Sequence, residues 1–166
     1  MIRVAIVTIS DKASRGERED LGRPAITEAL TSAQLEVDVV DYRVIPDEES
    51  SISEALFHLS ERPDVDLILT TGGTGLAPRD VTPQVTLNAI DYAVPGIAEA
   101  MRAASLKVTP AGMLSRGVAG VRRGTLIINL PGSPKAVREN LAAIAAALPH
   151  AVETLRGGVG DHNRPT

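Results

Sequence analysis

The chain has 166 residues, of which 43% are hydrophobic, and this is enough for one domain with a core of its own. Its formal net charge is −4 and its aromatic content is 2%, which argues against binding to nucleic acid. Cysteine is absent, which excludes disulfides and thiolate metal sites. The apolar runs are far too short to span a membrane, and the first residues resemble a strand rather than a signal peptide. We therefore expect a cytoplasmic protein that binds neither nucleic acid nor membrane.

Strand-like and helix-like patterns alternate along the chain. Residues 3–10 (RVAIVTIS) form a nearly continuous apolar run, which is typical of a parallel strand covered on both faces. Further strands are predicted at 37–45, 66–71 and 125–130, and helices at 25–33, 51–61, 83–90, 97–106 and 135–148, the last of which can extend to 155. This alternation predicts right-handed crossovers and a mostly parallel sheet with helices on both faces.

Two parts of the chain are less regular. Residues 109–124 contain too many turn residues to assign, and Arg122-Arg123 before Gly124 is interpreted as a solvent-exposed turn. The Gly-rich, polar segment 157–166 is predicted to be a flexible tail. Since no repeat or linker divides the rest, we expect residues 1–156 to form a single domain.

Polar or glycine-rich residues follow four of the predicted strands. Ligands of open α/β sheets bind outside the carboxyl ends of the strands, and parallel strands bring these ends to one edge. We therefore expect a binding site at this edge. Its candidate residues are Ser10, Asp11, Asp47, Gly72, Gly73, Thr74, Gly75, Gly132, Ser133, Pro134 and Lys135.

The segment Gly72-Gly73-Thr74-Gly75 has the composition of a phosphate-binding loop. Glycines permit positive φ and let an anion approach backbone N–H groups closely, and a threonine hydroxyl can donate. The segment is neither a Walker A sequence nor a dinucleotide fingerprint. A tight turn would have the same composition, so this segment alone leaves both interpretations open.

The segment Pro131–Lys135 marks the start of a helix after a strand. Ser133 suits the N-cap and Pro134 the first helical position. A helix start with free N–H groups beside a lysine attracts an anion, although an ordinary capped turn has the same features.

Asp47 and Asp80 are candidate metal ligands. Asp47 follows the second predicted strand, and Asp80 lies between Arg79 and a predicted helix. Either could simply cap loop backbone. Several acids beside phosphate loops are nevertheless what a Mg²⁺-nucleotide site requires, because the metal offsets phosphate charge. Ligation by oxygen alone suits Mg²⁺ rather than zinc.

Several short segments recur in the order of a known family. They are TISD (8–11), PD (46–47), TGGTG (71–75), PRDVTP (78–83), LSR (114–116) with AG (119–120), and LPGSPKAV (130–137). In this combination, nearly the whole chain resembles the molybdopterin-binding family of molybdenum-cofactor biosynthesis proteins, which includes molybdopterin adenylyltransferases. The resemblance implies a three-layer α/β/α sandwich, the molybdopterin-binding fold, usually assembled as a homotrimer.

The same resemblance implies the transfer of AMP. Stand-alone members join ATP and molybdopterin into adenylyl-molybdopterin and pyrophosphate with Mg²⁺, and a molybdenum-insertion protein receives the product. Carried over, Gly72–Gly75 with Ser115 would hold the pterin's phosphate, and Gly132–Lys135 would help to hold ATP. Asp47 and Asp80 would be the catalytic, metal-associated acids. The pterin's phosphate is already anionic, so catalysis would consist of positioning and charge neutralisation.

Gln84 departs from the family pattern, which commonly has Glu after the Thr-Pro pair. The amide keeps the size of the side chain but removes a charge and a metal or water ligand. The alternative function is therefore a catalytically weak molybdopterin-binding trimer that presents ligand or partner surfaces. A multidomain metal-inserting enzyme and the related domain joined to nucleotide amidases fit less well, because this chain has nothing left over for further domains.

Overall fold

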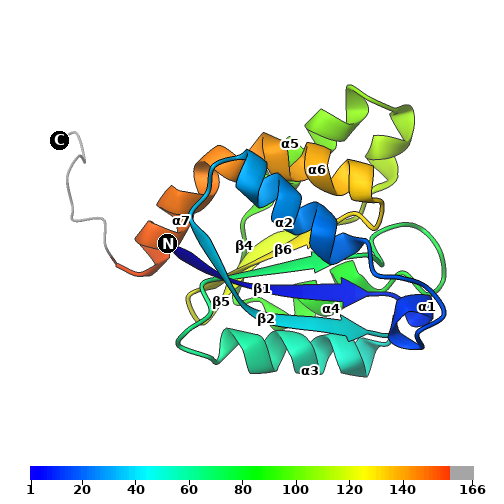
Figure 1. Ribbon diagram of the computed structural model, residues 1–166, viewed down its shortest axis with the longest axis horizontal. Coiled ribbons are helices and arrows are strands. Elements are labelled where there is room, and N and C mark those ends of the chain that lie inside the picture. The colour runs from blue at the N-terminus through cyan, green and yellow to red at the C-terminus, as the bar shows by residue number, and fades with distance from the viewer. Residues whose placement is uncertain (158–166) are drawn as a thin grey trace.

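A computed structural model describes residues 1–157, so 158–166 of the predicted tail lie outside the described residues. The strands are β1 (Ile2–Ile9), β2 (Val37–Ile45), β3 (Leu67–Thr71), β4 (Tyr92–Ala93), β5 (Ala119–Arg122) and β6 (Thr125–Leu130). The helices are α1 (Asp11–Ser14), α2 (Gly22–Ser32), α3 (Glu49–Ser60), α4 (Thr82–Ala89), α5 (Pro95–Leu106), α6 (Pro134–Ile144) and α7 (Leu148–Leu155), with 3₁₀ turns η1 (Pro110–Leu114) and η2 (Ala145–Ala147). Figure 1 shows the sheet between two layers of helices.

The six strands form one sheet in the order β2-β1-β3-β6-β5-β4. The first four of these are parallel, and β5 and β4 extend the sheet by antiparallel pairing. Consequently β2, β1, β3 and β6 all end at the same edge, on the side where α1 lies in Figure 1. This confirms the predicted mostly parallel α/β sheet.

Alternation along the buried strands divides the core between the two faces. On β1, Ile2, Val4 and Ile6 belong to a cluster with buried residues of α2, α5, α6 and α7. The intervening Ala5 and Val7 belong to a second cluster, which includes buried residues of α3 and α4. Because successive strand residues point to opposite faces, a continuous apolar strand fills both layers at once. The three-layer α/β/α sandwich is thereby confirmed.

The fold differs from the prediction mainly in the second half of the chain. The unassigned segment 109–124 holds η1 and β5, and the two-residue β4 was not predicted. The long last helix is divided into α6 and α7 by η2, and Pro149 lies in the first turn of α7, where its missing N–H is tolerated. The interpretation of Arg122 as solvent-exposed was wrong, since its side chain is 12% exposed and stacks 3.8 Å from the ring centre of Phe57.

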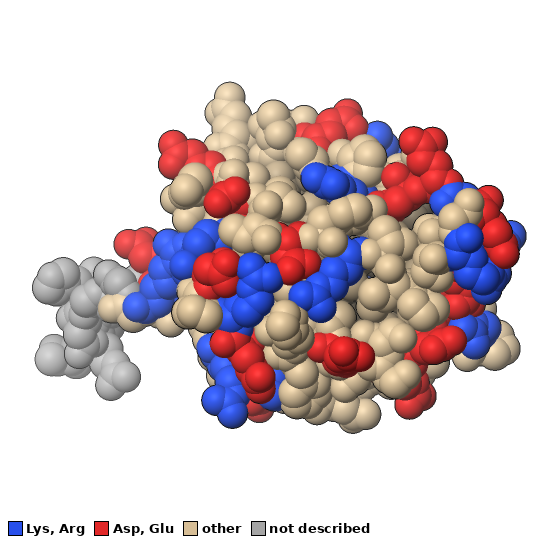
Figure 2. Space-filling model, turned by 60° about the horizontal axis from the view of Figure 1, so that its bottom comes forward, with Lys and Arg blue, Asp and Glu red and all other residues tan. Residues whose placement is uncertain are grey.

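Figure 2 shows acidic and basic side chains interspersed over the face in view. Within residues 1–157, none of the helices combines the length and apolar character needed to cross a bilayer.

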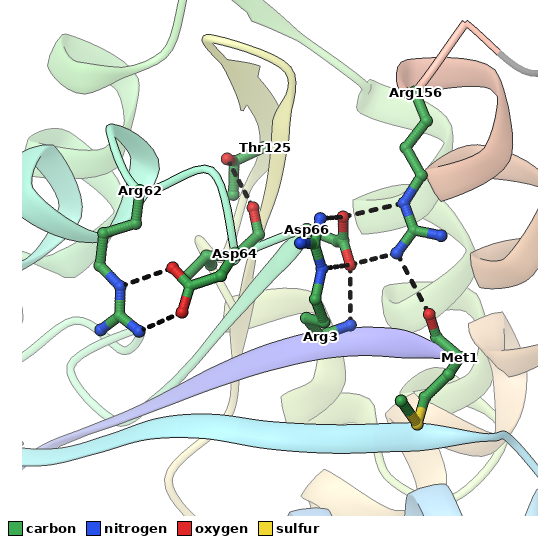
Figure 3. A network of polar contacts seen from close by, with 8 residues as sticks. Met1, Arg3, Arg62, Asp64, Asp66, Thr125 and Arg156 are labelled. Atoms are coloured by element: carbon green, nitrogen blue, oxygen red, sulfur yellow. Dashed lines mark hydrogen bonds and ion pairs between the residues drawn. The ribbon is translucent and has the colours of Figure 1, made fainter.

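A buried carboxylate joins three elements at the amino end of the sheet (Figure 3). The Asp66 side chain is 5% exposed and accepts hydrogen bonds from Arg3 of β1, with Nη2 at 2.7 Å and Nε at 2.9 Å. Arg156, just after α7, donates to the same carboxylate through Nε at 3.0 Å and through Nη2. Burial alone would raise the pKa of Asp66, but these charged donors outweigh it and hold that pKa well below its usual value. The cluster therefore fastens the end of α7 to the sheet.

Candidate active site

The four parallel strands carry the predicted site residues at their carboxyl ends. Following the order of the strands across the sheet, Asp47 comes after β2, Ser10 and Asp11 after β1, Gly72–Gly75 after β3, and Gly132–Lys135 after β6. These strands are hydrogen-bonded neighbours, so segments more than 100 residues apart in sequence lie along one edge. The structure thus brings together the residues predicted to converge.

Asp11 and Asp47 are joined by two hydrogen bonds, each from the backbone N–H of one residue to the carboxylate of the other. The Asp11 N–H donates to Asp47 Oδ2 at 2.9 Å, and the Asp47 N–H donates to Asp11 Oδ1 at 3.1 Å. Arg79 donates to both oxygens of Asp11, at 2.6 and 2.8 Å. The Arg79 guanidinium outweighs burial and lowers the pKa of Asp11. One carboxylate of the pair is therefore neutralised by Arg79.

Asp47 is in a different electrostatic environment. Burial raises its pKa, the hydrogen bond from the Asp11 N–H opposes this shift, and the negative charges of Asp11 and Asp80 add to it. The charge of Asp47 is thus costly unless a cation or a donor compensates it. Such a carboxylate is suited to binding a metal ion or a phosphate-bound cation.

The glycine-rich loop needs its glycines for geometric reasons. Gly72 and Gly73 both have positive φ, at 102° and 68°. A Cβ on Gly72 would lie 2.2 Å from the carbonyl oxygen of Ile9, and one on Gly73 would lie 2.3 Å from Thr82 Oγ1 and 3.2 Å from Asp47 Oδ1. The backbone at Gly72 and Gly73 therefore packs so closely against its neighbours, the Asp47 carboxylate among them, that neither position has room for a Cβ atom.

Asp80 lies beside the last glycine of this loop. A Cβ on Gly75 would lie 2.8 Å from Asp80 Oδ2, and that oxygen accepts a hydrogen bond from the Ala77 N–H at 3.0 Å. Ser115 is joined to the loop through its neighbour, because the Arg116 N–H donates to the carbonyl of Thr74 at 2.9 Å. Asp80 and Ser115 therefore belong to the same assembly as the glycines.

The segment after β6 forms the opposite side of the edge. Ser133 caps α6 by accepting from the Ala136 N–H at 3.3 Å, and Pro134 is in the first turn, as predicted. Thr71 donates its hydroxyl hydrogen to the carbonyl of Pro131 at 2.7 Å, which joins this segment to β3. The Lys135 side chain is 76% exposed and lies 3.8 Å from Glu139, so it has an acidic partner on its own helix.

A cavity of about 370 Å³ opens at this edge. Its walls come from the end of β1, from the segment before α2, from the start of the glycine-rich loop and from the start of α6. The lining residues are Thr8, Ile9, Ser10, Ala13, Arg18, Glu19, Asp20, Leu21, Gly22, Thr71, Gly72, Gly132, Ser133 and Pro134. A second, more open hollow is lined by Asp47, Glu48, Glu49, Ser50, Pro78, Arg79 and Val81. Ser10 and Gly72 thus face the first space, and Asp47 faces the second.

Asp20 is a structural part of the cavity wall that the sequence did not reveal. Its carboxylate accepts hydrogen bonds from Thr8 Oγ1 at 3.1 Å, from the Gly22 N–H at 2.8 Å and from the hydroxyl of Tyr42. Burial and the hydrogen bond to Asp20 raise the pKa of Tyr42 to about 12, so the Tyr42 hydroxyl remains a donor. Asp20 directly precedes Leu21, the N-cap of α2, and its partners on β1 and β2 could not be inferred from spacing.

The donor set fits Mg²⁺ only together with ligands from outside the protein. Among the described residues, no group of three or more His, Cys, Asp or Glu side chains forms a metal cage. Mg²⁺ usually takes one or two carboxylates and completes its shell with water and substrate phosphates. Asp47 and Asp80, both beside the glycine-rich loop, match that requirement.

Comparison with known proteins decides the family. The family model described as "Probable molybdopterin binding domain" matches residues 5–150. The chain belongs to the molybdopterin-binding family. It is 42% identical to molybdopterin adenylyltransferase of Helicobacter pylori over 156 residues, which cover 94% of this chain and 89% of that protein. It is 41% identical to molybdopterin adenylyltransferase of Escherichia coli K12 over 168 residues, which cover 94% of this chain and 86% of that protein.

A solved structure extends the family likeness to the fold. The crystal structure of a molybdopterin biosynthesis enzyme from Thermus thermophilus superposes with a TM-score of 0.87 at 52% identity, covering 95% of this chain and 98% of that chain. The family resemblance drawn from the motifs is confirmed. The prediction that the chain is an enzyme, a transferase, is confirmed as well, since relatives with that activity match it over most of its length.

Proposed function

We propose that this protein transfers AMP from ATP to the terminal phosphate of molybdopterin, giving adenylyl-molybdopterin and pyrophosphate in molybdenum-cofactor biosynthesis. The observation that carries the proposal is the meeting of a glycine-rich loop with Asp47 and Asp80 at the edge of the sheet that also opens into a cavity. The activity named for the relatives from Helicobacter pylori and Escherichia coli supports it.

The two substrates are assigned to two parts of the edge. We place the pterin's phosphate on Gly72–Gly75 with Ser115, because the backbone there is open to close approach. We place ATP at the cavity that Ser10, Gly132, Ser133 and Pro134 help to line. Lys135 follows Pro134 and Asp11 follows Ser10 in the sequence, and we assign both to substrate binding as well. At the start of α6, Pro134 has no N–H and the Ala136 N–H donates to Ser133, so we assign the Lys135 N–H to the nucleotide's phosphates.

The reaction then needs alignment more than activation. An oxygen of the pterin's phosphate attacks the α-phosphorus of ATP, a new P–O bond forms, and the bond to the β-phosphate oxygen breaks as pyrophosphate leaves with the electron pair. The loop and the cavity hold the two reacting phosphates in line, which supplies the larger part of the rate. Asp47 and Asp80 would hold Mg²⁺, which when bound offsets the negative charge of the phosphates.

The wider setting of the reaction is part of the same proposal. We propose that residues 1–156 act as one molybdopterin-binding domain, that three copies assemble into a homotrimer, and that a molybdenum-insertion protein receives the product. Exposed apolar side chains at the end of α5 and in η1 support self-association: Leu106, Val108, Met113 and Leu114. The use of ATP supports a cytoplasmic location.

The alternative, a molybdopterin-binding trimer with weak catalysis, depends on Gln84. This residue lies in the first turn of α4 with its side chain exposed, so a carboxylate can be introduced there without disturbing the core. If wild type binds molybdopterin but turns over slowly and Gln84→Glu raises the rate, the alternative is favoured.

Pyrophosphate release from the purified protein tests the proposed function. With molybdopterin, ATP and Mg²⁺ present, we expect steady release that stops when any one of the three is omitted. Release with ATP and Mg²⁺ but without the pterin would indicate an ATP hydrolase and would overturn the proposal.

A further inference from the structure

Arg116 joins the two ends of the loop that carries Asp80. Its Nε–H donates to the carbonyl of Gly75 at 2.8 Å, and its Nη2–H donates to the carbonyl of Asp80 at 2.5 Å. Its own backbone N–H donates to the carbonyl of Thr74 at 2.9 Å. Arg116 therefore links the two ends of the segment 76–80, which connects the glycine-rich loop to α4.

Apart from the bonds from Arg116, the ion pair of Arg79 with Asp11 ties this segment to the rest of the site. Residues 76–79 are exposed, and Leu76 is 65% exposed. Within the segment, Asp80 and Ala77 form a reciprocal pair, with the Asp80 N–H donating to the Ala77 carbonyl at 2.8 Å. That pair fixes the carboxylate relative to the segment but not relative to the glycines. The bonds from Arg116 connect the segment to the glycine-rich loop, whereas Arg79 connects it to Asp11.

Arg116 is itself fixed from α5. Arg102 donates through Nη1 to the carbonyl of Gly117 at 2.9 Å and to that of Ser115 at 3.4 Å, one on each side of Arg116. The position of Asp80 therefore depends on two successive sets of contacts, from α5 to residues 115–117 and from Arg116 to the loop. A guanidinium suits this role because its rigid fork donates in two directions at once, which an ammonium on a flexible stem does not reproduce.

We propose that Arg116 is a positioning residue that sets the Asp80 carboxylate against the glycine-rich loop. The inference rests on the proposed function for its kinetic consequence but not for its structural one. Arg116 acts through the carbonyls of Gly75 and Asp80 and leaves ligand binding to other groups. Loss of the guanidinium should therefore lower kcat and leave the KM for ATP, which we place elsewhere on the edge, nearly unchanged.

The test compares Arg116→Lys with Arg138→Lys. Arg138 is an exposed residue of α6 that pairs with Glu28 at 2.8 Å, so it provides the same chemical change away from the loop. We expect Arg116→Lys to lower kcat by about 100-fold, as a displacement of about 1 Å in an active site does, with the KM for ATP within about twofold of wild type. Amide hydrogen exchange in the peptide 75–80 should become faster in Arg116→Lys, and both quantities should be unchanged in Arg138→Lys.

Two readouts separate this inference from the proposed function. If wild type transfers no AMP, the proposed function fails, and exchange in 75–80 alone decides whether Arg116 holds the loop. Unchanged exchange in Arg116→Lys, or a rise in KM with kcat retained, would overturn the inference. If Arg116→Lys unfolds, Arg116→Ala with added guanidinium replaces it: restored protection of 75–80, with sodium as the control cation, is expected, and no restoration counts against the inference.

Discussion

The Asp80 carboxylate has one hydrogen bond that an amide can also accept, the one from the Ala77 N–H. Asp80→Asn therefore keeps the local turn and removes the negative charge alone. We expect kcat to fall at least about 100-fold while molybdopterin binding is retained, because the change removes electrostatic stabilisation and not a binding contact. Steady-state kinetics and pterin titration measure the two quantities. The control is Asp38→Asn on exposed β2 surface, and full activity in Asp80→Asn would remove this residue from the catalytic role.

Gly73 offers a second residue-level prediction with a matched control. Gly73 and Gly124 both have positive φ, at 68° and 81°, so alanine costs about 1 kcal/mol of backbone strain at either. A Cβ at Gly73 meets Thr82 Oγ1 at 2.3 Å, whereas one at Gly124 meets nothing within 4 Å. We expect Gly124→Ala to lower the unfolding free energy slightly and to leave turnover intact. Gly73→Ala should also abolish turnover, and equal activities of the two variants would mean that the loop is only a turn.

Sequence reasoning found these residues because each belongs to a local signal. A glycine run or an acid after a strand can be recognised without knowing its neighbours, and parallel topology then predicts that the strand ends meet. Asp20 was not found, and Arg116 was noticed only as part of the LSR motif, because the roles of both lie in contacts with residues distant in sequence. Arg116 contacts the carbonyl of Gly75 across 41 positions, and no spacing rule predicts which carbonyl an arginine will reach.

At the scale of elements, the β-α alternation was predictable because each buried element carries a strong pattern. β1 is apolar almost throughout, and α3 places Ile52, Ala55, Leu56 and Leu59 on one buried face. β4 consists of two exposed residues, and β5 consists of four residues, three of them buried and one of these Gly120, so neither strand is long enough to present a periodic pattern. The division of the last helix into α6 and α7 also escaped prediction, because alanines favour helix on both sides of the break.

The Asp66 cluster gives a prediction about how α7 is held. The folded pKa of Asp66 lies below its unfolded value of about 3.9, so its contribution to stability is complete well above that value and is lost as pH falls. We expect Asp66→Asn to lower the unfolding free energy by about 2–4 kcal/mol at neutral pH, since two arginines lose their charged partner.

Urea unfolding at pH 7 and at pH 3.5 measures the effect of Asp66→Asn. The difference from wild type should shrink at the lower pH, where the wild-type carboxylate begins to lose its advantage. The control is Asp64→Asn, whose carboxylate is 51% exposed and pairs with Arg62, because exposed pairs contribute about 0–1 kcal/mol. A difference for Asp66→Asn that is the same at both pH values would show that charge is not its cause.

At the scale of the whole molecule, the residues that stabilise the fold and the residues of the candidate site lie at opposite ends of the sheet. The cluster of Asp66 with Arg3 and Arg156 lies at the amino end of the strands, and the candidate site lies at their carboxyl end. Substitutions at the amino end should therefore change unfolding and leave turnover unaffected, whereas Asp80→Asn should do the reverse. This division follows from parallel strands, which place all their carboxyl-terminal loops at one edge.

The fate of the α-phosphorus of ATP tests adenylyl transfer most directly. ATP labelled at the α-phosphorus is incubated with molybdopterin, Mg²⁺ and the protein. The pterin product is then isolated, and its mass is measured by mass spectrometry. We predict that the label moves to the pterin together with the mass of an adenylyl group, and that a parallel γ-label leaves in pyrophosphate. Transfer of the γ-label to the pterin, or release of the α-label as free AMP alone, would contradict the proposed function.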